Sequence, residues 1–235
     1  VKVLEATGIE NVQKKKKKMG VFSKLPNQPS VALGTGEIYL NELAGVYASY
    51  VNDGKAVLPY LIESITNRND SILVKFRPKR AQNRAFSKQT EQIMIEMMRS
   101  TINTGTAKRI RSTYKLSNDI AGKTGTTQNN KDAWFVALTP KMVHITWVGL
   151  DNHEIGFRST SVGQGANAAL PLFALWYQQL NKDRSFDYIT KARFEKPNPY
   201  VLDQLNCEPI KKDGFLKRLF TNPKKKKSKQ FRKQN

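Results

Sequence analysis

The chain has 235 residues, of which 39% are hydrophobic, and a formal net charge of +21 at neutral pH. This length and composition exclude a collagen-like or disulfide-stapled chain and predict one globular core with irregular ends. Residues 1–30 carry an excess of +5 and residues 211–235 an excess of +10, whereas the long middle of the chain carries only +6. The charge therefore belongs mostly to the ends.

The cysteine content and the apolar segments exclude two structural features and leave the redox compartment undetermined. Cys207 is the single cysteine, so no intramolecular disulfide is possible. The longest apolar segment, Ala166 to Tyr177, contains Pro171 and is too short to span a bilayer. The chain begins with Val1 and lacks the pattern of a signal peptide, so we expect it to be a piece of a longer polypeptide.

The N-terminal part of the chain predicts two helices separated by an extended linker. Residues 1–20 favour a short helix in which Lys14 to Lys18 form a solvated face, and the prolines within 25–30 predict the linker. Apolar residues recur at helical spacing over 37–52, and Gly54 supplies a stop.

A hairpin and a longer helix follow. Residues 60–66 and 72–76 predict two strands joined by a turn. Ser87 is placed to cap a helix that runs to about residue 103 and ends at Gly105. Four of its side chains are expected on the buried face: Ile93, Met94, Met97 and Met98.

The second half of the chain predicts an antiparallel meander and a last helix. After a short basic helix or loop over 108–114, strands are expected at 119–127, 132–138 and 142–150. A final helix over 167–180 would pack on this sheet. The expected fold class is therefore α+β, an antiparallel sheet covered by helices.

We divide the chain into two parts, at about residue 181. Residues 1–181 carry the periodic patterns, whereas residues 182–235 are expected to be irregular. Lys224 to Lys227 and Arg232 give this tail a composition that cannot bury enough apolar area to fold.

Several short patterns do not support the functions that they suggest. Gly122 to Thr124 would end a phosphate-binding loop, but Ser117 stands where that loop needs a glycine. Gly34 to Gly36 would begin a dinucleotide fingerprint, but Tyr39 replaces its last glycine.

No cofactor or metal is predicted, because His144 and His153 are the only histidines and no cluster at ligand spacing accompanies them. Ser112 and Lys115 match S-x-x-K, a pair that on a helix would let a neutral lysine accept the serine proton. Their surroundings are typical of an exposed basic loop just before Lys123, which argues against a catalytic role.

The most informative segment is Lys123 to Thr127, at the start of the meander. A lysine, three hydroxyls and a glycine in five residues can hold a carboxylate and stabilise a developing oxyanion. Such a site suits acyl transfer, yet no convincing activated nucleophile accompanies it.

This segment and its surroundings resemble the C-terminal half of the transpeptidase domain of class A penicillin-binding proteins, which are bifunctional enzymes. The resemblance covers about residues 3–180. It rests on Ala121 to Thr127, Asp132 to Val136 and Trp147 to Gly149, and upstream on Ala32 to Glu37, Leu43 to Asn52, Gly54, Pro59 to Ile65, Asn103 to Gly105 and Ala107.

The family has three active-site signatures, S-x-x-K, S-x-N and K-T-G, and this chain carries the third alone in its proper place. Residues 1–12 resemble the segment that follows the second signature, so the chain is expected to begin just after it. The family's S-x-x-K lies further upstream, which puts Ser112 in the wrong place to be the nucleophile. We therefore expect this chain alone to be inactive.

The resemblance implies a role for each residue of the segment. Lys123 and the backbone N–H of Thr126 would be catalytic, the lysine by its charge and the N–H as an oxyanion donor. Substrate binding would involve Thr124, Gly125, Thr126 and Thr127. The hydroxyls of Thr124 and Thr126 would hold a terminal carboxylate, and Gly125 would let a peptide add as a strand.

By this resemblance the chain is part of a peptidoglycan D,D-transpeptidase that works through a serine acyl-enzyme, with the serine β-lactamase and penicillin-binding-protein fold. Its partners would be stem peptides, β-lactams and the upstream part of the same polypeptide, with no nucleic acid. It would work at the periplasmic or outer face of the bacterial cytoplasmic membrane, held by an upstream anchor.

One alternative stays open: a basic binding or scaffold protein, for nucleic acid or an anionic surface, that keeps the fold without catalysis. The basic tail favours it, because neutralised phosphates release counterions.

Overall fold

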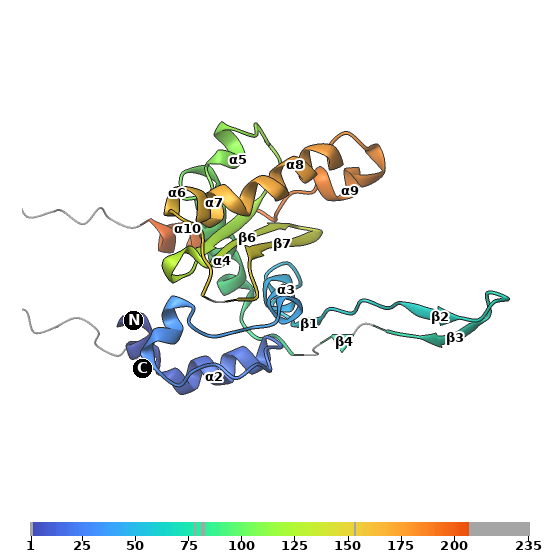
Figure 1. The fold of residues 1–235 in the computed structure, drawn as a ribbon, viewed down its shortest axis with the longest axis horizontal. Coiled ribbons are helices and arrows are strands. Elements are labelled where there is room, and N and C mark those ends of the chain that lie inside the picture. The colour runs from blue at the N-terminus through green and yellow to red at the C-terminus, as the bar shows by residue number, and fades with distance from the viewer. Residues whose placement is uncertain (1, 78, 81–82, 153, 207–235) are drawn as a thin grey trace, which may run out of the picture.

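The computed structural model describes residues 2–77, 79–80, 83–152 and 154–206, and a three-stranded antiparallel sheet lies at its centre (Figure 1). Its strands are β5 (Ala121–Thr126), β6 (Asp132–Thr139) and β7 (Met142–Gly149), in the order β5-β6-β7. Each is antiparallel to its neighbour. The predicted meander and the α+β class are therefore confirmed.

The central strand β6 is buried on both faces of the sheet, because it is apolar at successive positions. Successive side chains on a strand point to opposite faces. Phe135 and Ala137 belong to one core cluster, and Val136 and Leu138 belong to the other. Helices must cover both faces, and Figure 1 shows the sheet between a layer that contains α7 and α8 and a layer that contains α3 and α4.

Helix α8 (Leu170–Leu180) covers one face and buries Phe173 and Tyr177 completely. A short helix, α7 (Gly165–Ala168), precedes it, so the single helix predicted over 167–180 is divided. The division follows from Pro171, which has no N–H to donate to a carbonyl in the preceding turn.

Helix α4 (Lys88–Asn103) covers the other face together with α3 (Leu40–Ser49). Ser87 caps α4 as predicted, because its Oγ accepts the backbone N–H of Thr90 at 3.2 Å. The predicted buried face of α4 is wrong at Met97, a residue that is 53% exposed. The buried face instead follows helical spacing through Glu91, Ile95, Met98 and Ile102.

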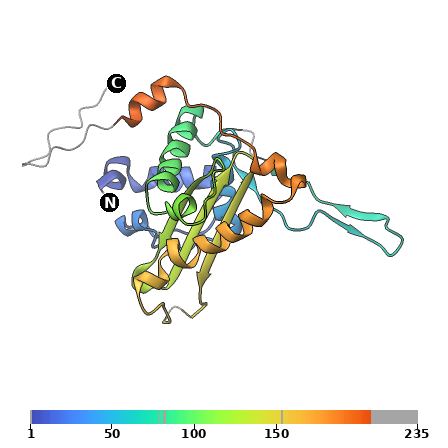
Figure 2. The ribbon, with the colours of Figure 1, turned by 90° about the horizontal axis from the view of Figure 1, so that it is seen from above.

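A narrow hairpin projects from the body of the molecule (Figure 2). It consists of β2 (Ser64–Thr66) and β3 (Ile72–Lys75), and every residue of both strands is exposed. Near its base, β1 (Val57–Leu58) pairs with β4 (Lys79–Arg80). The predicted hairpin is confirmed with shorter strands.

The N-terminal segment forms α1 (Lys2–Thr7) and α2 (Ile9–Lys18). The lysine run occupies the second half of α2 and is not wholly solvated, because Lys15 Nζ donates to the carbonyl of Ala85 at 2.7 Å. Within the described residues no helix combines the length and the apolar composition needed to cross a membrane. The remaining short elements are η1 (Pro29–Leu33), α5 (Arg109–Ser112), η2 (Gln128–Asn130) and α6 (Thr160–Gly163).

The segment after α8 is more regular than expected. It forms η3 (Arg184–Phe186), α9 (Asp187–Thr190) and α10 (Pro199–Leu205), and α10 packs on α4. The expectation of irregular structure from residue 182 is therefore wrong over residues 184–190 and 199–205, whereas residues 191–198 form no helix or strand. Cys207 and the basic run of the tail lie outside the described residues, and the division at residue 181 stays a prediction.

One buried carboxylate attaches this segment to the sheet layer. Asp119, just before β5, is 8% exposed and accepts the backbone N–H of Phe194 at 3.0 Å. Its other oxygen pairs with Arg99 of α4 at 3.1 Å. A side chain next to the predicted site thus holds residues that lie far along the sequence.

Candidate active site

Strand β5 forms one edge of the sheet, because β6 is its single partner strand among the described residues. The backbone N–H of Thr127 donates to the carbonyl of Asp132 on β6 at 3.1 Å. Main-chain groups of successive strand residues point to opposite sides. The N–H and carbonyl of Gly125 therefore point to β6, whereas those of Thr124 and Thr126 point to the free edge.

Lys123 is an exposed residue whose Nζ donates to the carbonyl of Thr124. That carbonyl faces the free edge, so the ammonium group lies beside the edge where an extended peptide would pair. The lysine shares its face of the sheet with Val136, its partner in register on β6. The position agrees with the role predicted for Lys123, which remains a prediction.

Thr124 and Thr126 point to the opposite face, and their hydroxyls are both in hydrogen bonds. Thr124 is 9% exposed, and its Oγ1 lies 2.6 Å from the Oγ1 of Thr106. Thr126 is exposed, and its Oγ1 accepts the backbone N–H of Gly165 at 3.1 Å. The structure thus adds Thr106 and Gly165 to the site.

Glycines bring the two layers together at this point. A Cβ on Gly165 would lie 2.2 Å from the carbonyl oxygen of Trp134 and 2.6 Å from that of Gly125. A Cβ on Gly125 would lie 3.1 Å from the Cβ of Trp134. The start of α7 therefore contacts the backbone of β5 and β6 as closely as only glycine permits.

Thr127 differs from the other residues of the segment, because its hydroxyl is committed to the turn that follows. Its Oγ1 donates to Asp132 Oδ2 at 3.0 Å and accepts the Asp132 backbone N–H at 2.8 Å. The other carboxylate oxygen of Asp132 accepts Trp147 Nε1 at 2.8 Å. This network gives Thr127 a structural partner at the position for which substrate binding was predicted.

The S-x-x-K match does not form a helical pair. Helix α5 ends at Ser112, whose Oγ donates to the carbonyl of Lys108 at 3.2 Å. Lys115 lies beyond the helix with φ of 55°, in the left-handed region. The two side chains therefore do not share one helix face, in agreement with their exclusion as catalytic residues.

His144 lies on β7 among aromatic residues. Its ring stacks on Trp176 at 5.0 Å between centroids, and its Nε2 lies 2.8 Å from Thr146 Oγ1. Burial lowers the pKa of His144. Among the residues that the structure describes, no group of three potential metal ligands occurs, and His153 is not described.

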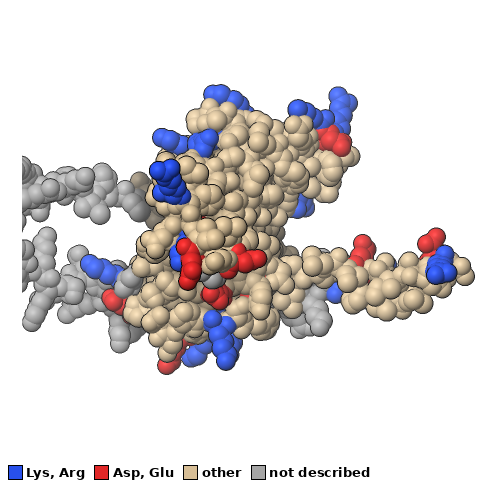
Figure 3. Space-filling model, viewed as in Figure 1, with Lys and Arg blue, Asp and Glu red and all other residues tan. Residues whose placement is uncertain are grey.

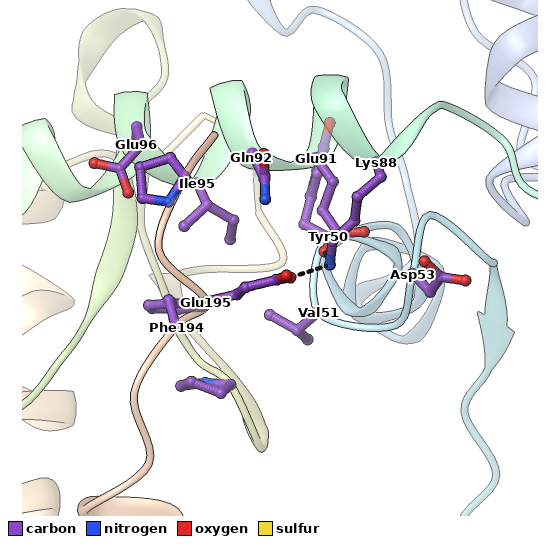
Figure 4. Close-up of a pocket in the computed structure, with 12 residues that line it drawn as sticks. Tyr50, Val51, Asp53, Lys88, Glu91, Gln92, Ile95, Glu96, Phe194 and Glu195 are labelled. Carbon is purple, nitrogen blue, oxygen red and sulfur yellow. Dashed lines mark hydrogen bonds and ion pairs between the residues drawn. The ribbon is translucent and has the colours of Figure 1, made fainter. Parts of the chain in front are cut away.

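A cavity of about 170 Å³ lies apart from β5, between α3, α4 and the segment after α9 (Figure 4). Tyr50 and Phe194 contribute to its wall, and burial raises the pKa of Tyr50. Lys88 Nζ forms ion pairs with Glu91 at 2.8 Å and with Glu195 at 3.1 Å. None of the residues that line this cavity comes from β5, so it is not part of the predicted site.

A helix-covered antiparallel sheet with Lys-Thr-Gly on its edge strand is the arrangement of penicillin-recognising serine enzymes. Residues 2–169 match the family model described as the penicillin binding protein transpeptidase domain. Because the match spans more than half of the chain, this chain belongs to the penicillin-binding protein transpeptidase family.

Named relatives agree with this membership. Penicillin-binding protein 1A of Neisseria meningitidis (serogroup A / serotype 4A, strain Z2491) is 33% identical over 177 residues, which are 74% of this chain and 22% of the relative. Penicillin-binding protein 1A of Rickettsia typhi is 30% identical over 205 residues, which are 78% of this chain and 25% of the relative. The predicted resemblance to the class A transpeptidase region is confirmed, and the chain spans about a quarter of these relatives or less.

The fold is also shared with a solved structure. The crystal structure of penicillin-binding protein 1A from Haemophilus influenzae superposes with a TM-score of 0.69 at 23% sequence identity. The shared region covers 84% of this chain and 34% of that one. At this identity the likeness concerns the fold alone, and it confirms the predicted fold class.

Proposed function

We propose that this chain supplies the K-T-G strand and its supporting helices to a D,D-transpeptidase that cross-links peptidoglycan stem peptides through a serine acyl-enzyme. The observation that carries the proposal is the free edge of β5. Along it the carbonyl of Thr124 and the N–H of Thr126 are directed away from β6. An extended stem peptide pairs there as an added strand.

The residues of β5 then have different roles, which depend on their positions along the strand. The N–H of Thr126 donates to the oxyanion that forms when the substrate carbonyl is attacked, a contact whose loss costs about 100-fold to 1,000-fold in rate. Lys123 places positive charge beside the edge and attracts the substrate carboxylate. Thr124 and Thr126 hold this carboxylate by their hydroxyls, and Gly125 leaves room for the peptide.

The serine nucleophile and its S-x-x-K lysine belong to a segment outside this chain, supplied by the parent polypeptide. A β-lactam acylates that serine while its carboxylate binds the same β5 site. The working location is the outer face of the cytoplasmic membrane.

The comparisons give no support to the alternative of a basic binding or scaffold protein. On the face drawn in Figure 3, lysine and arginine stand in separate groups with acidic residues among them.

Labelling with a fluorescent penicillin tests this function. The 235-residue chain alone should form no covalent adduct, whereas the parent polypeptide should be labelled. In the parent, Lys123→Ala should slow acylation at least about tenfold, because a charge-assisted contact to the carboxylate is lost. Lys141→Ala is the matched control, since this exposed lysine lies in the turn between β6 and β7, outside the β5 site.

Two outcomes would contradict the proposal. A labelled band from the chain alone that disappears on Ser112→Ala would place the nucleophile within this chain. Equal acylation of the parent and its Lys123→Ala variant would remove the role given to β5.

A further inference from the structure

The two threonine hydroxyls of β5 are each held by a group from a different part of the chain. Thr124 is held by Thr106, which follows the end of α4, and Thr126 is held by the N–H of Gly165, at the start of α7. These partners lie 18 and 39 residues away along the sequence. Hydroxyls that bind a ligand need a fixed orientation, which partners of this kind impose.

The partner of Thr126 determines the direction of its hydrogen bond. A backbone N–H can only donate, so Thr126 Oγ1 is the acceptor at 3.1 Å. A hydroxyl that accepts one hydrogen bond keeps its own proton for a second partner. Thr126 is an exposed residue, and its proton is therefore available to a ligand that accepts hydrogen bonds, such as a carboxylate.

The hydrogen bond between Thr124 and Thr106 can run in either direction, and a bound anion favours one of the two. The two Oγ1 atoms are 2.6 Å apart, and either can be the donor. When Thr106 donates, the Thr124 proton is free to point at a ligand. When Thr124 donates, a lone pair faces the ligand instead and repels a carboxylate. A bound carboxylate therefore fixes Thr106 as the donor.

Arg109 connects the segment that carries Thr106 to helix α7, which carries Gly165. Its Nη1 donates to the carbonyl of Ala166 at 3.1 Å and to Asn167 Oδ1 at 2.6 Å. Arg109 lies three residues after Thr106, and Ala166 directly follows Gly165. The segment that carries one supporting group is thus bonded to the helix that carries the other.

We propose that Thr106 and the Gly165 N–H, connected through Arg109, are positioning groups that orient the Thr124 and Thr126 hydroxyls as paired donors to the carboxylate of the substrate terminus. This assignment rests on the proposed function. It goes beyond it by making a residue outside the K-T-G strand responsible for carboxylate affinity. It also explains why α7 approaches β5 through a glycine.

Binding of a small peptide to the 235-residue chain tests the assignment without requiring acylation. The probes are N-acetyl-D-alanyl-D-alanine and its C-terminal amide, and the dissociation constants are measured from the amide NMR shifts of β5. Wild type should prefer the carboxylate peptide. Thr106→Val should weaken that peptide roughly tenfold, because a hydrogen bond to a charged group loses its support, and should leave the amide peptide unchanged.

Two further variants separate positioning from general damage. Thr106→Ser restores the hydroxyl and should recover most of the affinity. Thr104→Val is the matched control, because Thr104 is also exposed and its hydroxyl bonds to the Ser100 carbonyl of α4 at 3.2 Å. Since Thr106 is itself exposed, its substitution by Val should leave the dispersion of the NMR spectrum intact.

The outcomes distinguish the inference from the function beneath it. If wild type binds the carboxylate and amide peptides equally or not at all, the proposed function of β5 fails and the inference fails with it. If wild type prefers the carboxylate and Thr106→Val keeps that preference, the function stands and the inference is overturned. A loss that Thr106→Ser does not recover also overturns it.

Discussion

Strand β5 and the β2–β3 hairpin both expose strand edges, but they differ in how their side chains are held. On β5, Thr124 and Thr126 are bonded to groups from two other segments. On the hairpin every residue of both strands is exposed, and Asn67 organises the turn by accepting the N–H groups of Asn69 and Ser71 at 2.9 and 3.0 Å. A two-stranded hairpin alone leaves its side chains exposed to solvent. A strand that binds a ligand needs side chains that are held in place by groups from neighbouring layers.

The most severe way to break the support of β5 is to add a methyl group at Gly165. A Cβ there would meet two backbone carbonyl oxygens at 2.2 and 2.6 Å, and backbone cannot move aside as a side chain can. Gly165→Ala should lower the free energy of unfolding by about 3 kcal/mol. Chemical denaturation of the 235-residue chain measures it.

Gly34→Ala is the control for that substitution. Gly34 has φ of 83°, but a Cβ on it would meet no heavy atom within 4 Å, so it reports conformational cost without a clash. It should lose about 1 kcal/mol. Equal losses at the two glycines would mean that α7 can move away from β5 at little cost.

A second prediction concerns Asp119, which joins the start of β5 to the segment after α9. Asp119→Ala leaves the Phe194 N–H and the Arg99 guanidinium without their buried acceptor, and should cost about 2 kcal/mol. Asp187→Ala removes an exposed pair with Lys191 and should cost less than about 0.5 kcal/mol. Comparable losses in urea denaturation would show that Asp119 does not anchor this segment.

The sequence was sufficient for features that depend on local pattern. The cap at Ser87, the helix that it begins and the meander around Lys123 all follow from spacing within about fifteen residues, and all are present. The break before α8 is not predicted although Pro171 lies in the segment, because apolar residues continue on both sides of it.

The sequence was insufficient where partners come from distant segments. Thr106 lay between residues that carried the family resemblance, yet no spacing rule pairs it with Thr124. Gly165 and Arg109 had no local signal, since their importance comes from a contact between layers. Strand β5 could therefore be predicted as a site, but its supporting groups could not.

A third prediction concerns the pH dependence of folding stability, which we expect to depend on His144 of β7. Burial lowers the pKa of His144 in the folded chain below its ordinary value of 6.5. Between the two pKa values the unfolded chain binds more protons, so folding stability should fall as the pH falls below about 6.5. Unfolding free energies measured between about pH 5 and 8 should show this loss in wild type and less of it in His144→Gln. Parallel curves for the two proteins would contradict it.

The smallest expected loss of stability is at the hairpin, and the same substitution on β6 provides the contrast. Val74 on β3 is 43% exposed, and Val136 on β6 is 4% exposed. The same change to Ser should cost less than about 0.5 kcal/mol at Val74 and about 3 kcal/mol at Val136, where apolar contacts are lost and a hydroxyl is buried. A large loss at Val74 would show that the hairpin packs against a partner surface. Dependence of that loss on protein concentration would identify the surface as a second copy of the chain, and the contrast between a supported and an unsupported strand edge would then fail.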